Sequence, residues 1–501
     1  PPHQREDEMS DNKKVGRVIY EDPSSAPQES LHWKRLVNEN DGSILHTHDE
    51  LIRAFQSDVD SFKSKRKKEN YQSLALWSCI IGYCEALATH KDAARRFALF
   101  PIPLDSLRRL IEEDFLPLLS QEQNTSNKKD KHSTTKESES VHRQTVRAVS
   151  NAIWKKAQNK KSSMQDEPHA NSLYSCLCGD VDGKSLDCFG AALLVVIGMN
   201  ILGFSNSCLT LSEDHAYESH LEDVDNNASN DQQSPRKRAT CEVAVPGNTK
   251  AAQSKRGKEI SHTFEQLKCE HITAETSWLY MAKNPVLCDT PGMVMAALVS
   301  NLNCDIDKQK IAADGSKPQV VSRPLYKMKR DMLWILHDGL CMTRFPFSLI
   351  ELGDCEEHVA SQKGMEWVDA SELLKSKGTQ ILRNEKLYID AISISKTIYE
   401  DAQVYPFLYA AHYHRDAGKN DKSQEYRLVE SLRLYAEATR VASTYRYHNK
   451  DCLQLMKHFT ICASLISKDI LLLPQNGEGN GKDARPWQHH ENAIAAATWL
   501  V

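Results

Sequence analysis

The fold is decided by one stretch, residues 186–217, which reads LDCFGAALLVVIGMNILGFSNSCLTLSEDHAY. Residues 189–204 are almost all apolar, which predicts a helix that is buried on all of its faces. Gly203 ends this helix, and after a short polar turn Cys208–Leu211 alternates in polarity like a strand. The four polar residues 212–215 follow this strand directly, and we expect their side chains to lie close together.

A cysteine at the start of a buried helix and a histidine on the next strand are typical of papain- and transglutaminase-like enzymes. In such a site the helix dipole and a nearby imidazolium lower the pKa of the thiol, while a carboxylate orients the histidine. Cys188, His215 and Glu242 are the residues that could take these three roles in this chain.

A structural role for the same residues is the interpretation that we favour. Cysteine is among the most buried residue types, and Cys188 precedes a run typical of a protein core. In an enzyme the strand after the histidine would stay apolar, whereas residues 217–262 are strongly polar, and we interpret them as an insert. We therefore predict no catalytic residues. Acyl transfer by Cys188 and His215, as in a transglutaminase or cysteine protease, remains the alternative.

The composition indicates a substantial core and nearly balanced charge. Hydrophobic residues make up 40% of the 501 residues, and this length leaves room for several domains. A formal net charge of -5 argues against a protein that coats nucleic acid. The basic stretches at residues 63–68, 128–131 and 235–238 could each contact DNA weakly or direct nuclear import, but the interpretation that we favour for each is a solvated loop or helix face.

The 14 cysteines are scattered along the chain, which favours reduced thiols in the nucleus or cytosol. Because the N-terminal residues are polar and charged, we expect no signal peptide. The longest apolar run contains Asn200 and is shorter than the roughly 20 residues of a membrane-spanning helix, so no membrane contact is expected. His169, Cys176, Cys178 and Cys188 lack the spacing of a zinc site, so we expect neither metal nor cofactor.

Apolar periodicity predicts helices in most of the remaining chain, so the expected fold class is mainly α with a small β component. A strand is predicted at residues 241–245. A helix is predicted to begin at Leu51, after a capping box at residues 47–50. Further helices are predicted at residues 71–88, 104–119, 141–156, 291–302, 325–340, 368–377, 387–402, 405–416, 423–445 and 452–472.

These patterns divide the chain into five parts. They are a disordered segment at 1–45, a helical N-terminal lobe at 46–145 with a polar loop at 121–140, a degenerate transglutaminase-like α+β lobe at 146–304, tetratricopeptide-like helical repeats at 325–472, and a C-terminal loop with a truncated last element at 473–501. The chain ends inside an apolar segment. We therefore expect either that the sequence continues downstream or that this last element packs against the rest of the protein.

Several short blocks, in this order and at about this spacing, resemble the menin family. They are SLYS at 172–175, Leu186-Asp187 with Gly190, LTLSEDHA at 209–216, AETSWLY at 274–280, CD at 288–289, YPFLY at 405–409 and YRY at 445–447. The SEDHA and SWLY blocks are the most specific, and the resemblance covers about residues 46–470.

The resemblance implies a nuclear, in part cytoplasmic, scaffold that regulates transcription and suppresses tumours, and not an enzyme. In this family a transglutaminase-like fold and tetratricopeptide helices enclose a deep cavity that accepts a short peptide. The implied partners are the N-terminal peptide of mixed-lineage leukaemia-type histone methyltransferases, a JunD-type transcription factor and, through the methyltransferase, lens-epithelium-derived growth factor. A plain helical-repeat adaptor with its ligand on the convex face is a further alternative.

Carried over position by position, the resemblance implies a peptide-binding site with residues from both lobes. From the enzyme-like lobe they are Asp166, Asp187, Phe189, Leu211, Ser212, Glu213, Asp214, His215 and Ala216. From the helical-repeat lobe they are Phe345, Phe347, Tyr405, Leu408, Tyr409 and Tyr435. The aromatic and apolar side chains would hold an apolar anchor of the peptide, and the carboxylates would hold its arginines.

Three positions depart from the family pattern. Lys457 and Thr460 stand where the family has glutamates, which is expected to weaken binding of an arginine-bearing ligand. Phe189 stands where the family has a small serine and is expected to narrow the cavity. Ordinary packing between helices is the competing interpretation for each aromatic residue of the implied site.

Overall fold

The structure is a computed structural model, and it describes two compact units. The first comprises residues 1–209, 217–261 and 288–341, and the second comprises residues 210–216, 262–287 and 342–501. Within them the structure describes residues 48–64, 66–89, 188–212, 216–221, 238–241, 285–304, 323–362, 373–376, 379–418 and 424–444, with isolated positions at 109, 113, 145, 146, 148–150, 153, 174 and 464. The helices predicted at 104–119, 141–156 and 452–472 lie outside these ranges apart from such positions.

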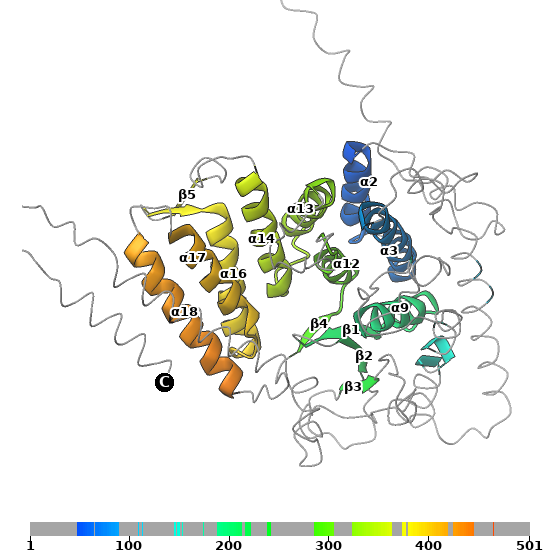
Figure 1. Ribbon diagram of the computed structural model, residues 1–501. Helices are drawn as coiled ribbons and strands as arrows, with labels where there is room; N and C mark the ends of the chain where they lie inside the picture. Colours follow the sequence, from blue (N-terminus) through cyan, green and yellow to red (C-terminus); the bar gives the residue numbers. More distant parts are fainter. Residues whose placement is uncertain are drawn as a thin grey trace, which may run out of the picture. The chain divides into compact units, whose positions relative to one another are not determined.

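Five helices form the described core of the first unit (Figure 1). They are α2 (His48–Ser61), α3 (Lys67–Thr89), α9 (Cys188–Ile201), α12 (Pro291–Ser300) and α13 (Arg323–Asp338). Helix α3 packs against α9 and α12, while α13 packs against α2 and α12. The hydroxyl of Thr290 accepts a hydrogen bond of 3.2 Å from the backbone N–H of Met293, which fixes the start of α12.

Helix α9 confirms the prediction of a fully buried helix, because every residue from Phe189 to Ile201 is buried. The one polar side chain, Asn200, donates hydrogen bonds to the backbone oxygens of Val196 (2.9 Å) and Ser207 (3.0 Å). Burial of this amide is therefore compensated in part. The chain leaves the helix at Gly203, whose φ of +97° is easily reached only without a Cβ.

A small sheet follows α9, with the strand order β3-β2-β1-β4. Its strands are β1 (Cys208–Leu211), β2 (Ala216–Leu221), β3 (Arg238–Cys241) and β4 (Val286–Cys288). Strand β1 is where the sequence predicted it. Strands β2 and β3 pair antiparallel, with Ser219 opposite Thr240. Strand β3 ends at Cys241, the first residue of the strand predicted at 241–245, and the other residues of that prediction lie outside the described part.

Strand β2 corrects our prediction of a polar insert that begins at residue 217. Tyr217, Glu218, Ser219 and His220 are buried in this strand and do not belong to an exposed loop. Polar residues do not indicate exposure where they can pair with one another in the interior. Here Glu218 accepts a hydrogen bond of 2.8 Å from the hydroxyl of Ser207 and pairs with His220 at 3.3 Å, so the polar atoms stabilise one another inside the unit.

The part of the second unit that the structure describes consists mainly of four helices (Figure 1). Its elements are α14 (Pro346–Gln362), β5 (Leu373–Ser376), β6 (Thr379–Leu382), α16 (Arg383–Tyr399), α17 (Tyr405–Gly418) and α18 (Gln424–Thr444). Helix α16 packs against α14, and α17 packs against α14, α16 and α18. The helices predicted at 387–402, 405–416 and 423–445 are confirmed with small shifts at their ends.

The helix predicted at residues 368–377 is wrong, because Leu373–Ser376 forms strand β5 of a hairpin. In this hairpin Ser376 pairs with Thr379, so that only Lys377 and Gly378 separate the two strands. A two-residue connection that contains glycine is typical of a tight hairpin, and this signal outweighs the weak helical periodicity of the segment. The described part of the chain is otherwise mostly helical with a small antiparallel sheet, as expected. None of its helices is both long and apolar enough to span a membrane.

Candidate functional site

The most distinctive surface of the second unit is a line of aromatic rings along α17. Tyr405, Tyr409 and His412 follow one another at helical spacing, and each of these side chains is half-buried. The ring centroids of Tyr405 and Tyr409 are 6.3 Å apart, and those of Tyr409 and His412 are also 6.3 Å apart. The ring of Tyr435, from α18, lies 5.6 Å from that of His412. We call Tyr405, Tyr409, His412 and Tyr435 the aromatic row.

The other faces of α17 explain why the rings of Tyr405, Tyr409 and His412 remain partly accessible. Phe407, Leu408, Ala411 and Tyr413 are buried, because the helix packs against α14, α16 and α18. Pro406 lies in the first turn, where a proline costs no helical hydrogen bond. The remaining face therefore presents its rings to solvent on a backbone that three neighbouring helices hold in place.

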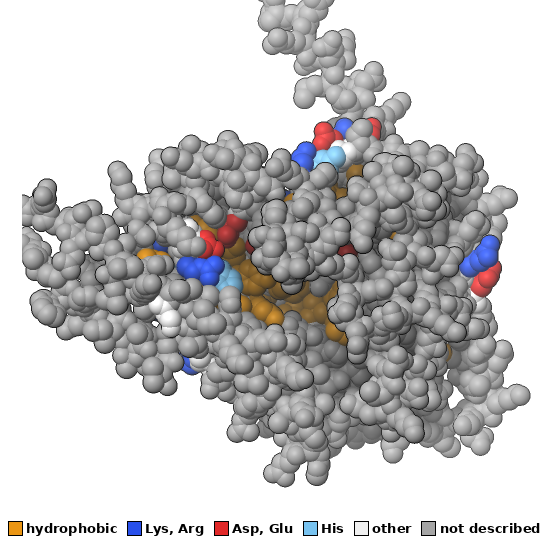
Figure 2. All heavy atoms as spheres, viewed as in Figure 1, with side chains coloured by type: hydrophobic (Ala, Val, Ile, Leu, Met, Phe, Trp, Pro, Cys, Tyr) orange, Lys and Arg blue, Asp and Glu red, His pale blue; other side chains and the backbone are white. Residues whose placement is uncertain are grey.

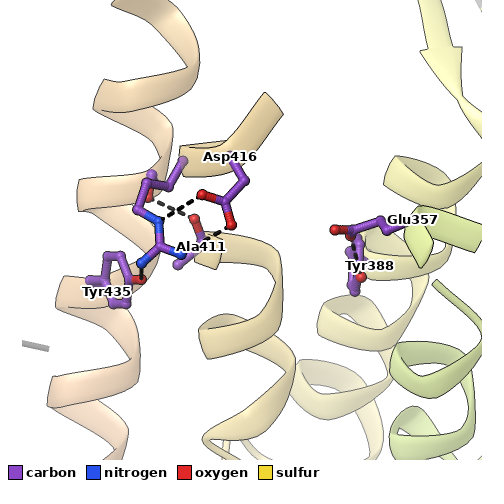
Figure 3. A network of polar contacts seen from close by, with 7 residues as sticks. Glu357, Tyr388, Ala411, Asp416 and Tyr435 are labelled. Atoms are coloured by element: carbon purple, nitrogen blue, oxygen red, sulfur yellow. Dashed lines mark hydrogen bonds and ion pairs between the residues drawn. The ribbon is translucent and has the colours of Figure 1, made fainter. Parts of the chain in front are cut away.

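A polar network holds the end of the aromatic row (Figure 3). Arg415 donates a hydrogen bond of 3.4 Å to the hydroxyl of Tyr435 and two hydrogen bonds, of 3.1 Å and 3.0 Å, to Asp416. The hydroxyl of Ser431 on α18 donates a hydrogen bond of 2.7 Å to the backbone oxygen of Ala411 on α17. Since Ser431 and Tyr435 are one turn apart, α18 is fixed to α17 directly beside the row.

A second contact in Figure 3 joins α14 to α16. The hydroxyl of Tyr388 donates a hydrogen bond of 2.5 Å to the carboxyl group of Glu357. Burial raises the pKa of Glu357 to about 8, and the negative charges of Asp354 and Asp416 raise it as well, against the effect of the Tyr388 hydrogen bond. Glu357 is therefore mostly protonated at neutral pH and contributes little negative charge.

The helices behind the aromatic row carry further buried and half-buried polar groups. The ring of Tyr413 lies 5.3 Å from that of Tyr388, and its hydroxyl donates a hydrogen bond of 3.4 Å to Glu385. Arg427 pairs with Glu385 at 3.7 Å. Burial lowers the pKa of His414 to about 4, so this imidazole is neutral at physiological pH. Together these groups link α16, α17 and α18 into a firm support for the exposed face.

The surface over α16 and α17 combines several kinds of side chain. In Figure 2, basic, acidic and histidine side chains gather there beside hydrophobic side chains. Aromatic rings with charged groups at the border are the usual composition of a site for a short peptide. The arrangement provides binding groups, and none of the contacts in the aromatic row resembles a nucleophile activated by a base.

The structure brings some of the implied site residues together and leaves others buried. Tyr405, Tyr409 and Tyr435 meet in the aromatic row, whereas Leu408 lies on a buried face of the same helix. Phe345 is buried and Phe347 is half-buried, with ring centroids 6.2 Å apart. Phe189, Leu211 and Ala216 are buried, and Ser212 is half-buried. Asp166, Asp187, Glu213, Asp214, His215, Lys457 and Thr460 lie outside the described residues.

The cysteine of the enzyme alternative lies where the sequence placed it, at the first residue of α9, and it is half-buried. Its expected partners His215 and Glu242 lie outside the described residues, so their geometry with Cys188 stays a prediction. Among the residues that the structure describes, no group of three or more His, Cys, Asp or Glu side chains could hold a metal ion.

Sequence reasoning missed three contributors to the site. His412 could have been found, because it follows Tyr409 by three residues and Tyr405 by seven on one helical face. Glu357 and Tyr388 are the other two. The hydrogen bond between them joins residues 31 positions apart, and no local sequence pattern indicates such a contact.

Two comparisons with known proteins agree with this architecture. A family model described as Menin matches residues 44–473 of the chain. The chain is also similar to a crystal structure of menin that reveals the binding site for Mixed Lineage Leukemia (MLL) protein. The TM-score is 0.55 and the sequence identity 23%, and the match covers 89% of this chain and 83% of that chain. At this identity the similarity concerns the fold.

Proposed function

Because the chain belongs to the menin family, we propose that it is a scaffold that binds short peptides of chromatin regulators and transcription factors. The observation that carries the proposal is the aromatic row, in which the half-buried rings of Tyr405, Tyr409 and His412 are held on a firmly packed helix. Aromatic rings fixed in this way bury large apolar area at little cost in conformational entropy, which suits them to act as anchors for a ligand.

The proposed ligand is a peptide with an apolar anchor residue and flanking arginines. Tyr405 and Tyr409 would contact the anchor, and the faces of these rings would also attract a guanidinium group. Asp416 lies one turn beyond His412 but is already paired with Arg415, so it offers less to an incoming arginine than a free carboxylate would. With Lys457 and Thr460 replacing family glutamates, we expect a larger share of the affinity to come from the aromatic contacts.

The N-terminal segment of a mixed-lineage leukaemia-type histone methyltransferase is the partner that we favour. The support is the family membership and the fold shared with a menin whose structure reveals the binding site for MLL protein. A JunD-type peptide is a second ligand of the same class. We further propose a nuclear and partly cytoplasmic location, recruitment of lens-epithelium-derived growth factor through the methyltransferase, and only weak contact with DNA.

The scaffold is proposed to act without a covalent step. Cys188 begins a helix whose other residues are all buried, and the strand β2 that follows the histidine segment carries the paired Glu218 and His220. This pair is already engaged inside the unit with Ser207, which suits a structural role. Iodoacetamide labelling at neutral pH tests the alternative. We expect slow modification of Cys188, and rapid modification that does not change with pH would favour the enzyme.

Isothermal titration calorimetry with the full chain tests the scaffold proposal. The titrant is a methyltransferase N-terminal peptide, and a peptide of the same composition in scrambled order serves as the control. We expect saturable binding of the native order alone. If the folded protein binds neither peptide at high micromolar concentration, the proposed function is wrong.

A further inference from the structure

We propose that the turn between α2 and α3 is a second docking surface, and that it binds an acidic, unfolded segment of a partner protein. The described basic residues of this turn are Lys63, Arg66, Lys67 and Lys68, and we call them the basic turn. All of them belong to the first unit, whereas the aromatic row belongs to the second. The inference therefore goes beyond the function proposed above and does not depend on it.

Three cations of the basic turn face solvent. Lys63, Arg66 and Lys68 are exposed, and no carboxylate in the part of the chain that the structure describes forms an ion pair with them. Of the flanking acids, Asp60 accepts a hydrogen bond of 2.9 Å from an amide one turn earlier on α2. Glu69 lies in the first turn of α3, where a carboxylate interacts favourably with the helix N-terminus. The turn therefore keeps a surplus of positive charge.

Hydrogen bonds fix the backbone that carries these cations. The N–H of Phe62 donates to the oxygen of Val59 at 3.1 Å, and the N–H of Ser64 donates to the oxygen of Ser61 at 3.0 Å. From α3, the side-chain amide of Asn70 donates a hydrogen bond of 3.0 Å to the backbone oxygen of Phe62. A ligand that binds here does not have to order a loop, which is one of the costs of association.

Lys67 has a different role, because it anchors the turn to the rest of the unit. Its amine donates a hydrogen bond to the backbone oxygen of Ser205, in the turn that follows α9. The same amine lies 5.8 Å from the centroid of the Tyr71 ring. Lys67 thus holds the start of α3 in place, while the other three cations present their charge to solvent.

The composition of the surface decides the kind of partner. The exposed side chains described at residues 63–68 are Lys63, Ser64, Arg66 and Lys68, and none of them is hydrophobic. The turn therefore lacks the apolar core that an interface with a folded partner needs, and it offers complementary charge to an anion instead.

A short acidic segment fits this surface better than a nucleic acid does. A duplex carries negative charge along its whole length and extends beyond the turn, where the net charge of -5 on this chain repels it. An unfolded segment rich in glutamate or aspartate meets only the turn, and its carboxylates pair with the ammonium and guanidinium groups.

Fluorescence anisotropy of a short labelled peptide of alternating glutamate and serine, titrated with the full chain at low ionic strength, tests this surface. The test variant is Lys63→Gln/Arg66→Gln/Lys68→Gln, which keeps the anchor Lys67. We expect it to bind the peptide at least about tenfold more weakly than the unchanged chain, because the contributions of three ion pairs are lost together. Added salt should weaken binding to the unchanged chain, since exposed charges are screened.

The matched control is Arg53→Gln/Lys327→Gln/Lys396→Gln, which removes the same charge from exposed positions outside the basic turn. It should bind the peptide within about twofold of the unchanged chain. Circular dichroism and thermal unfolding establish that each variant is folded. Equal affinities of the two triple variants, or no binding by the unchanged chain, would overturn this inference.

A DNA duplex titrated in the same way distinguishes the two kinds of polyanion. We expect it to bind the unchanged chain more weakly than the acidic peptide does, and tighter binding of the duplex would overturn the assignment to a protein partner. The test variant should bind the methyltransferase N-terminal peptide as the unchanged chain does. Failure of the inference about the basic turn therefore leaves the proposed function standing.

Discussion

The hydroxyl of Tyr388 lies 2.5 Å from the carboxyl group of Glu357, and this hydrogen bond joins α16 to α14. It is formed by a carboxyl group whose pKa burial has raised to about 8. The helices that support the aromatic row are thus held together partly by a protonated acid. This has consequences for stability that can be measured without any ligand.

Replacement of Glu357 by glutamine should flatten the pH dependence of stability on the alkaline side. The pKa is about 8 in the folded chain and 4.5 as the ordinary value, so the folded state holds the proton more tightly. The stabilisation is fully present below pH 4.5 and is lost as the pH rises through about 8. We expect the unchanged chain to lose on the order of 2 kcal/mol of unfolding free energy between about pH 6 and pH 9, and Glu357→Gln to lose much less.

Urea denaturation at several pH values measures this slope, and Tyr388→Phe is the matched variant. Without its hydroxyl the hydrogen bond is gone, but Glu357 stays buried, so the slope should persist at lower overall stability. An identical slope in Glu357→Gln and the unchanged chain would show that this carboxyl group does not titrate as described.

Titration of His414 should lower the stability of the fold at acidic pH, whereas titration of Glu357 lowers it at alkaline pH. Burial lowers its pKa to about 4 from an ordinary value of 6.5, so the unfolded state takes up the proton more readily. The stability that depends on neutral His414 is present above pH 6.5 and is lost as the pH falls through about 4. His414→Gln should therefore lose about 2 kcal/mol less than the unchanged chain between about pH 7 and pH 4. A proton NMR titration that placed the pKa of His414 near 6.5 would contradict this.

A methyl group at Gly353 should separate α14 from α16. A Cβ atom added there would lie 2.8 Å from Cζ of Tyr388, a buried ring that is held by its hydrogen bond to Glu357. We expect Gly353→Ala to lower the unfolding free energy by about 1–3 kcal/mol, although alanine normally favours a helix. In a Tyr388→Ala background, where the obstructing ring is absent, the same Gly353→Ala change should cost much less. Thermal unfolding of the single and double variants measures both effects.

The sequence predicted most reliably what short-range patterns determine. The apolar run of α9 required burial whatever surrounded it, and the aromatic and apolar spacing of residues 405–416 placed α17. The family resemblance identified Tyr405 and Tyr409 as site residues, and their spacing of four residues places them side by side on α17. His412 obeys the same geometry and was missed only because the resemblance did not point to it.

The rest depended on contacts between distant segments. Glu218 and His220 look exposed in the sequence, and only the folded sheet shows that they pair with each other near Ser207. The raised pKa of Glu357 requires α14, α16 and the end of α17 to meet. Strand β5 depends on its partner β6, because a four-residue segment has too little periodicity to distinguish helix from strand.

Calorimetric titration of a methyltransferase N-terminal peptide into Tyr409→Ala tests most directly whether the half-buried face of α17 binds a peptide. Tyr409 touches both Tyr405 and His412 in the row, so its loss should weaken binding by about 2 kcal/mol. The matched variant Tyr426→Ala removes the same side chain from an exposed position outside the row and should bind like the unchanged chain. Equal affinities for Tyr409→Ala and Tyr426→Ala, with both variants folded, would contradict the account.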